Sequence, residues 1–205
     1  VSQQAHGIMG HVHHVGDMQY TARGWANAAP ETNGNARECE NSLRHLVAMA
    51  RSHAEVVPVT IYGVATALER SPEQVAAMQA AGWEIATHGL KWIDYRNIDR
   101  ETEAAHIAEA IRLHTAVTGA RPLGFYQGRT SMNTVALGCE EGGFAYLADS
   151  YADELPYWHV HDGRPQLMVP YTLDANDMRF ANGGFTNGEE FFLYLRDAFD
   201  CLWRE

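Results

Sequence analysis

The sequence predicts an α/β fold in which helices cover a mostly parallel sheet. Strand-like and helix-like stretches alternate from about residue 56 to the last residues, and several of the strand-like stretches are apolar almost throughout. Strands have this composition when they are buried on both faces, as they are in a parallel sheet between helices. The chain has 205 residues, which is enough for one domain with a sizeable core and too few for two ordinary ones.

The first 55 residues differ in character from the rest. Residues 1–40 are rich in Gly, Asn, His and Ala and show little apolar periodicity, so we expect irregular structure there. Residues 41–53 place apolar side chains at helical spacing and predict a helix. We therefore expect two parts, an atypical segment over 1–55 and a folded domain over 56–205.

The folded part begins with a strand, a helix and a second strand. The β-branched run at 56–64 predicts a buried strand, and the apolar run at 83–87 predicts the next one. Between them, Ser71 suits the cap of a helix, Pro72 suits its first position, and Gly82 suits its end.

The second half continues this alternation. Asp99 is a candidate cap for a long helix over 100–118, and Gly119 is its expected end. The remaining elements are strands expected at 122–127, 144–149 and 166–173, and helices expected at 133–141 and from Thr186 to the last residues.

Polar side chains follow four of these expected strands. Parallel strands in such folds carry their active groups at their carboxyl ends, so these side chains should lie on one rim. They are His88, then Arg129 and Ser131, then Asp149, Tyr151 and Asp153, then Asp174, Asn176 and Asp177. An imidazole or a carboxylate can act as general base on water, a guanidinium can bind a carbonyl, and amide and hydroxyl groups can bind a polar heterocycle. The set favours hydrolysis of a small, amide-like substrate.

Each of these residues also has a structural interpretation. Asp149 and Asp174 could accept backbone N–H groups at loop starts, and Arg129 could belong to an ion pair. His88 could be a hydrogen-bonded core histidine. Trp92 stands four residues after His88, where a second metal ligand would be expected, but an indole does not ligate metals, so we expect Trp92 to form a wall.

Composition narrows the class of partner. The net charge is −11 and the pI about 5.4, which disfavours nucleic acid and an anionic membrane as partners. Three cysteines lie far apart, which is typical of a reduced compartment. The first residues lack the pattern of a signal peptide, and we expect a cytoplasmic protein. His6, His11, His13 and His14 could bind a transition metal, although an exposed segment is the simpler interpretation.

Three long stretches carry a resemblance to a known family. They are HGLKWIDYRNIDRETEAAHIAEAIRLHTAVTGARPLGFYQGRTSMNT from His88, EEGGFAYLADSYADELPYW from Glu140, and VPYTLDANDMRF from Val169. They resemble the metal-independent allantoinases of the polysaccharide deacetylase (NodB homology) superfamily, over about residues 56–205. The resemblance implies an irregular (β/α) barrel of about seven strands. It also implies hydrolysis of allantoin to allantoate, in purine catabolism.

The resemblance assigns roles to the residues at the strand ends. Deacetylases of the superfamily hold a divalent metal with an early Asp and an HxxxH pair. Here His88 matches the first histidine and Trp92 stands at the second. The implied site therefore holds no metal, with zinc as the alternative cofactor. The implied catalytic residues are His88, Arg129 and Asp149, and the implied substrate-binding residues are Trp92, Asp94, Ser131, Tyr151, Asp153, Asp174 and Asn176.

The chain also departs from the family. No strand with an acidic motif is recognisable in 1–55, and the family continues past the stretch that ends at Glu205. We therefore expect an incomplete barrel, whose open edges favour association, and the family implies a homo-oligomer. Two alternatives to an allantoinase stay open, a metal-dependent polysaccharide N-deacetylase and a catalytically inactive fragment.

Overall fold

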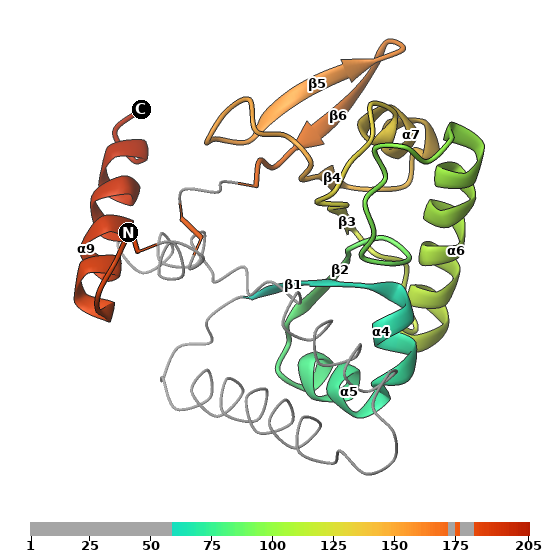
Figure 1. Cartoon of the computed structure of the whole chain (residues 1–205), viewed down its shortest axis with the longest axis horizontal. Coiled ribbons are helices and arrows are strands. Elements are labelled where there is room, and N and C mark those ends of the chain that lie inside the picture. Colours follow the sequence, from blue (N-terminus) through green and yellow to red (C-terminus); the bar gives the residue numbers. More distant parts are fainter. Residues whose placement is uncertain (1–58, 172–174, 177–182) are drawn as a thin grey trace.

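The strands of the described residues form one six-stranded sheet (Figure 1) in the order β1-β2-β3-β4-β6-β5. The structure is a computed structural model, and it describes residues 59–171, 175–176 and 183–205. Neighbouring strands run parallel except β5 and β6, which form an antiparallel hairpin. The strands are β1 (Thr60–Gly63), β2 (Glu84–Thr87), β3 (Gly124–Phe125), β4 (Tyr146–Leu147), β5 (Tyr157–His161) and β6 (Arg164–Met168). The predicted α/β class is confirmed.

The sheet stays open within the described residues. Its two edges are β1 and β5, and no described strand joins them. This arrangement matches the incomplete (β/α) barrel that the sequence predicts. The described residues do not test the division into 1–55 and 56–205, since residues 1–58, with the expected helix at 41–53 and the four early histidines, lie outside them.

Among the helices of the described residues, four pack near the strands and a fifth stands apart (Figure 1). They are α4 (Ala65–Arg70), α5 (Pro72–Ala80), α6 (Arg100–Thr118), α7 (Thr134–Glu141) and α9 (Gly188–Leu202). The predicted boundaries of α6 are confirmed, because the Asp99 carboxylate accepts the N–H of Thr102 at 2.9 Å and Gly119 has a left-handed φ of 80°. None of these helices combines the length and the apolar content that crossing a bilayer requires.

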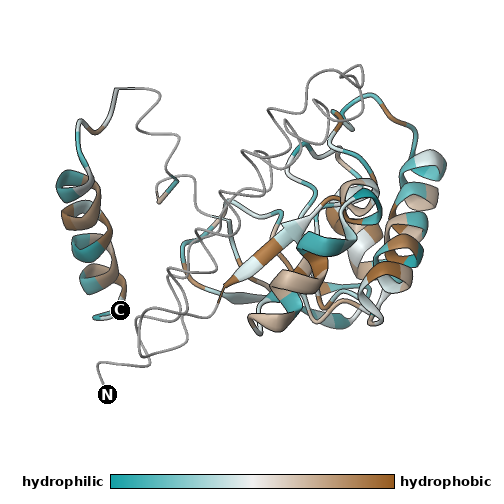
Figure 2. Cartoon of the chain, turned by 90° about the horizontal axis from the view of Figure 1, so that it is seen from below, coloured by the Kyte–Doolittle hydropathy of each residue, from teal (hydrophilic) through white to brown (hydrophobic). Residues whose placement is uncertain are grey.

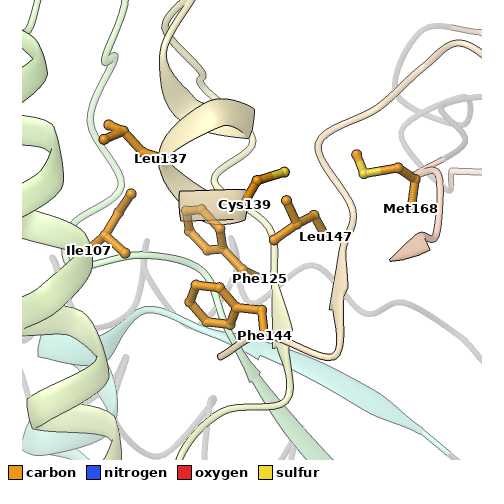
Figure 3. Close-up of a cluster of buried hydrophobic side chains, with 7 residues drawn as sticks. All are labelled: Ile107, Phe125, Leu137, Cys139, Phe144, Leu147 and Met168. Atoms are coloured by element: carbon orange, nitrogen blue, oxygen red, sulfur yellow. The ribbon is translucent and has the colours of Figure 1, made fainter. Parts of the chain in front are cut away.

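The two faces of the strands have different neighbours. On the face toward α6 and α7, strand side chains pack with residues of these helices in an apolar core (Figure 3), made of Ile107, Phe125, Leu137, Cys139, Phe144, Leu147 and Met168. Tyr126 and Ala148, the residues after Phe125 and Leu147, point the other way and join a tyrosine-rich layer, made of Tyr62, Ala86, Tyr126, Ala148 and Tyr171. This alternation follows from the two-residue period of a strand. The tyrosine-rich layer lies next to the carboxyl ends of the strands, where Tyr126 contacts the His88 ring.

The sequence missed two elements and placed one cap wrongly. Helix α4 and strand β5 were not predicted, and the strand expected at 166–173 is β6, which spans Arg164–Met168. Ser71 makes no side-chain cap to α5, because it also ends α4. Its N–H donates to the Leu68 carbonyl at 3.0 Å, and its φ of −132° and ψ of 54° differ from the extended backbone of a capping residue.

Candidate active site at the carboxyl ends of the strands

Asp149 joins the ends of two neighbouring strands. It lies two residues past β4, and its Oδ2 accepts the backbone N–H of Gln127 at 2.5 Å. Its Oδ1 accepts the N–H of Gly128 at 2.8 Å. The sequence placed these segments on one rim because both follow parallel strands, and the contacts confirm that they meet. These bonds also give Asp149 the loop-supporting role that was its structural interpretation.

Burial makes the Asp149 carboxyl more basic than usual. The residue is 8% exposed, and burial raises its pKa from the ordinary 3.8 to about 7. The two backbone N–H groups oppose this shift, whereas the negative charge of Glu103 adds to it. Near neutral pH the group therefore exchanges a proton readily, which suits a general base or acid.

His88 lies beside the loop that Asp149 holds. Its backbone N–H donates to the Gly63 carbonyl at 2.8 Å, which places it directly past β2, and the residue is 1% exposed. Gly128 has a φ of 76°, and a Cβ there would lie 3.0 Å from the His88 Cε1 atom. Glycine at position 128 thus supplies both the left-handed turn and the room for the imidazole.

Tyr126 connects the site to the tyrosine-rich layer. Its ring stacks on Tyr171 with centroids 4.5 Å apart and lies 5.1 Å from the His88 ring. Its hydroxyl lies 3.2 Å from the Tyr151 hydroxyl. The Asn176 amide donates to the Tyr171 hydroxyl at 2.7 Å. Tyr151 and Asn176, both expected to bind substrate, therefore reach the same layer as His88.

Arg129 lies against Trp92. The guanidinium carbon is 4.4 Å from the centroid of the indole, and the Arg129 carbonyl accepts the N–H of Tyr95 at 3.0 Å. Arg129 is exposed and Trp92 is half-buried, so both can meet a molecule from solvent. A guanidinium on an aromatic face is a favourable cation–π pair. Its contact thus differs from the ion pair that was the structural alternative for Arg129.

The contacts of the other predicted residues lie elsewhere. Asp94 is exposed and accepts the N–H of Arg96 at 2.9 Å, and Asp153 is exposed and accepts the N–H of Glu154 at 2.8 Å. The Ser131 hydroxyl donates to a buried carboxylate, described below. Asp174 lies outside the described residues. A role in substrate binding stays a prediction for all four.

Sequence reasoning missed Tyr126 and Gln127. Tyr126 could have been found, because it alternates with the core residue Phe125 in the expected strand at 122–127. Gln127 is 1% exposed, and its side chain lies over Gly89, where an added Cβ would come within 2.3 Å of its Oε1. Within the described part of the chain its Nε2 has no hydrogen-bond partner. No signal in a single sequence marks this contact.

The described residues do not form a metal-binding set. No three His, Cys, Asp or Glu side chains among them lie close enough together to hold a metal ion. The position four residues after His88 holds Trp92, which contacts Arg129 instead. The donor groups of this part of the chain therefore do not fit the divalent metal of the deacetylases.

Known proteins resemble this chain in both sequence and fold. The family model described as "Polysaccharide deacetylase" matches residues 49–138. A Schizosaccharomyces pombe protein named "Putative polysaccharide deacetylase" is 36% identical over 166 residues, which are 73% of this chain and 52% of that protein. The chain thus spans about half the length of this curated relative.

Two solved structures share the fold. One is a "probable polysaccharide deacetylase" from Pseudomonas aeruginosa PAO1, at 49% identity and a TM-score of 0.73, with 79% of this chain and 54% of that one covered. The other is the PuuE allantoinase, at 44% identity and a TM-score of 0.73, with 91% of this chain and 58% of that one covered. The family match, the relatives and the open α/β sheet together support the placement of this chain in the polysaccharide deacetylase superfamily.

Proposed function

We propose that the chain hydrolyses a C–N bond of a cyclic amide, and that its substrate is allantoin, which is opened to allantoate. The observation that carries this proposal is the contact of Arg129 with Trp92, because the resemblance places Trp92 where a metal-binding deacetylase has its second histidine. The likeness to an allantoinase at 44% identity supports the choice of substrate.

Asp149 is the general base in this proposal. Asp149 takes a proton from water, whose oxygen adds to a ring carbonyl carbon. The C–N bond then breaks, the ring nitrogen takes this proton from Asp149, and the new carboxyl group releases its own proton to solvent to become a carboxylate. Each carboxylate oxygen of Asp149 accepts one backbone N–H and retains a lone pair for water. A pKa of about 7 lets the same group accept and return the proton near neutral pH.

The other residues orient the substrate in this proposal. The face of Trp92 suits a flat heterocycle, and the planar guanidinium of Arg129 suits a ring carbonyl on which negative charge develops. His88 positions the water or a substrate amide from its place beside Gly128. The neutral phenols of Tyr126 and Tyr151 supply hydroxyl groups at the same rim, and burial raises the pKa of both.

Metal-dependent N-deacetylation of a polysaccharide is the second candidate. The names of the S. pombe and P. aeruginosa relatives favour it. The donor groups of the described residues count against it, because they do not gather around a metal position. The two candidates differ in substrate and in their need for a metal, so one experiment separates them.

The test is release of allantoate from allantoin by the purified chain, with and without a strong chelator, on a sample whose circular dichroism shows a folded protein. We expect activity that survives chelation and falls by about 100-fold or more in Asp149→Asn. The matched control is Asp162→Asn, at an exposed turn, which we expect to keep full activity. Acetate release from an N-acetylated sugar polymer that a chelator abolishes would support the deacetylase instead. A folded chain without either activity would support an inactive fragment.

A further inference from the structure

A buried carboxylate outside the predicted site holds the loop that carries Arg129. Glu103 projects from the first turns of α6 and is 0% exposed. Its Oε2 accepts the Ser131 hydroxyl at 2.5 Å, and its Oε1 accepts the hydroxyl of Thr134. Burial of an acid is costly, so a completely buried glutamate between two hydroxyls needs a reason for its presence.

The direction of these hydrogen bonds is fixed by their surroundings. The Ser131 hydroxyl oxygen accepts the N–H of Asn133 at 2.8 Å, and the Thr134 hydroxyl oxygen accepts the N–H of Ser131 at 2.9 Å. The hydrogen of each hydroxyl is therefore directed toward Glu103. Both Glu103 oxygens act as acceptors, and the form that fits this pattern is the ionised carboxylate.

The loop is consequently held at both of its ends. At residues 127 and 128, backbone N–H groups donate to Asp149, and at residues 131 and 134, side chains donate to Glu103. Arg129 lies between these two anchors, where its carbonyl accepts the Tyr95 N–H and its guanidinium covers Trp92. The second anchor therefore fixes the part of the segment between Arg129 and the start of α7.

We propose that Glu103 is a positioning residue of this site, which anchors the loop of residues 127–134 so that the Arg129 guanidinium lies over Trp92. The benefit of this placement for catalysis rests on the proposed function, whereas the anchoring of the loop by Glu103 does not. Glu103 touches none of the reacting groups and acts through the loop.

The same carboxylate also acts on Asp149 through its charge. The negative charge of Glu103 raises the pKa of Asp149, and burial is the larger cause of that shift. Other titratable groups coupled to Asp149 are the phenols of Tyr62, Tyr126 and Tyr151, all with raised pKa values and neutral near pH 7. His88 is the imidazole beside the same loop. Glu103 is the carboxylate among these neighbours, so removing its negative charge should lower the pKa of Asp149.

The decisive variant is Glu103→Gln. The carboxamide presents one acceptor and one donor, so its NH₂ meets a hydroxyl hydrogen and one anchor bond is lost. Thr134→Val removes one anchor bond but keeps the charge of Glu103, and Glu103→Asp keeps the charge on a shorter stem. Glu101→Gln makes the same change of charge on the exposed side of α6 and is the matched control.

Two measurements test the placement without enzymatic activity. Hydrogen–deuterium exchange over residues 126–134 should be faster in Glu103→Gln and Thr134→Val, and unchanged in Glu101→Gln. Carboxyl ¹³C NMR titration should show the pKa of Asp149 falling in Glu103→Gln only, since Thr134→Val and Glu103→Asp retain the charge. If the variants differ from the wild type in this way but the wild-type chain has no allantoinase activity, the proposed function fails and the positioning role of Glu103 stands.

Kinetics test what the anchor does for the reaction. We expect kcat/KM for allantoin to fall by about 10- to 100-fold in Glu103→Gln, as for the loss of a charged hydrogen bond. Glu103→Asp should recover part of this loss, and the acid limb of the pH profile should move to lower pH in Glu103→Gln alone. Exchange rates and an Asp149 pKa that match those of Glu101→Gln would overturn the proposal.

Discussion

Asp149 shows how one side chain can combine a structural bond pattern with an unusual pKa. Its two backbone N–H partners stabilise the ionised form, yet burial and the charge of Glu103 outweigh them and raise the pKa to about 7. The folded chain thus holds a proton on Asp149 at pH values where the unfolded chain has already released it. Shifted pKa values of this kind are common at active sites, where a proton must move near neutral pH.

This shift predicts a specific pH dependence of stability. Between pH 4 and pH 7 the folded state binds more protons at Asp149 than the unfolded state, so this group lowers the free energy of unfolding as the pH rises, by roughly 4 kcal/mol at most. His114 has the opposite effect, because burial lowers its pKa to about 4 and the unfolded chain binds the extra proton. The two slopes oppose each other between pH 4 and pH 6.5.

The measurement is urea unfolding of the wild type and of Asp149→Asn at one-unit steps from pH 4 to pH 8. In the variant we expect the free energy of unfolding to rise with pH up to about 6.5, because the contribution of His114 is then unopposed. The wild type and the Asp162→Asn control should be flatter over the same range. Equal slopes in all three proteins would show that Asp149 titrates normally in the folded chain.

At the residue scale, strand-end reasoning located some of the candidate site. His88 and Asp149 could be predicted to lie on one rim, because each follows a strand of a parallel sheet and such strand ends share an edge. Glu103 could not be predicted, since it is one acidic residue among several on α6. Its burial depends on the hydroxyls of Ser131 and Thr134, which come from a distant part of the sequence.

At the scale of elements, the β5–β6 hairpin depends on its two-residue turn. Asp162 has a φ of 49° and Gly163 a φ of 73°, the pair of left-handed residues that a tight hairpin requires. An added Cβ at Gly163 meets no atom within 4 Å. The cost of a side chain there is therefore conformational and not steric.

We expect Gly163→Ala to lower the free energy of unfolding by about 1 kcal/mol, because an L-residue is disfavoured in the left-handed region. The matched control is Gly188→Ala, where an added Cβ also meets nothing within 4 Å, but the backbone does not require a left-handed φ. This methyl group lies at the start of α9 and should be neutral or slightly stabilising. Chemical denaturation of both variants decides the matter, and equal effects would contradict a left-handed turn at Gly163.

The missed elements have physical explanations. The Asp-Gly pair is a known hairpin signal, but β5 has five residues, two of them histidines, and so short a mixed run does not stand out as a strand. Helix α4 begins at Ala65 directly after β1, with Val64 at the cap position and no side-chain cap. Helix α6, by contrast, has both a capping aspartate and a terminal glycine, and its predicted boundaries were correct.

At the scale of the whole molecule, α9 lies apart from the described strands, and Phe185, just before the helix, packs against its Phe191 and Tyr194. The helix is amphipathic (Figure 2), yet none of its residues is buried; Phe192 is 57% exposed, and Trp203, directly after the helix, is 60% exposed. Figures 1 and 2 show it apart from the sheet. Among the described residues, the buried clusters draw on β1 to β6 and on α4 to α7, and none of them includes a residue of α9.

Removal of α9 should therefore leave the sheet domain intact. We expect a chain that ends after residue 182 to unfold with the same Tm, within about 2 °C, because none of the described buried clusters includes a residue of α9. Leu147→Ala is the positive control, since Leu147 is 1% exposed in the core beside α6 and its truncation should cost about 2–5 kcal/mol. Thermal unfolding followed by circular dichroism compares the three chains. A fall in Tm comparable to that of Leu147→Ala would mean that the apolar stripe of α9 covers the open sheet in solution.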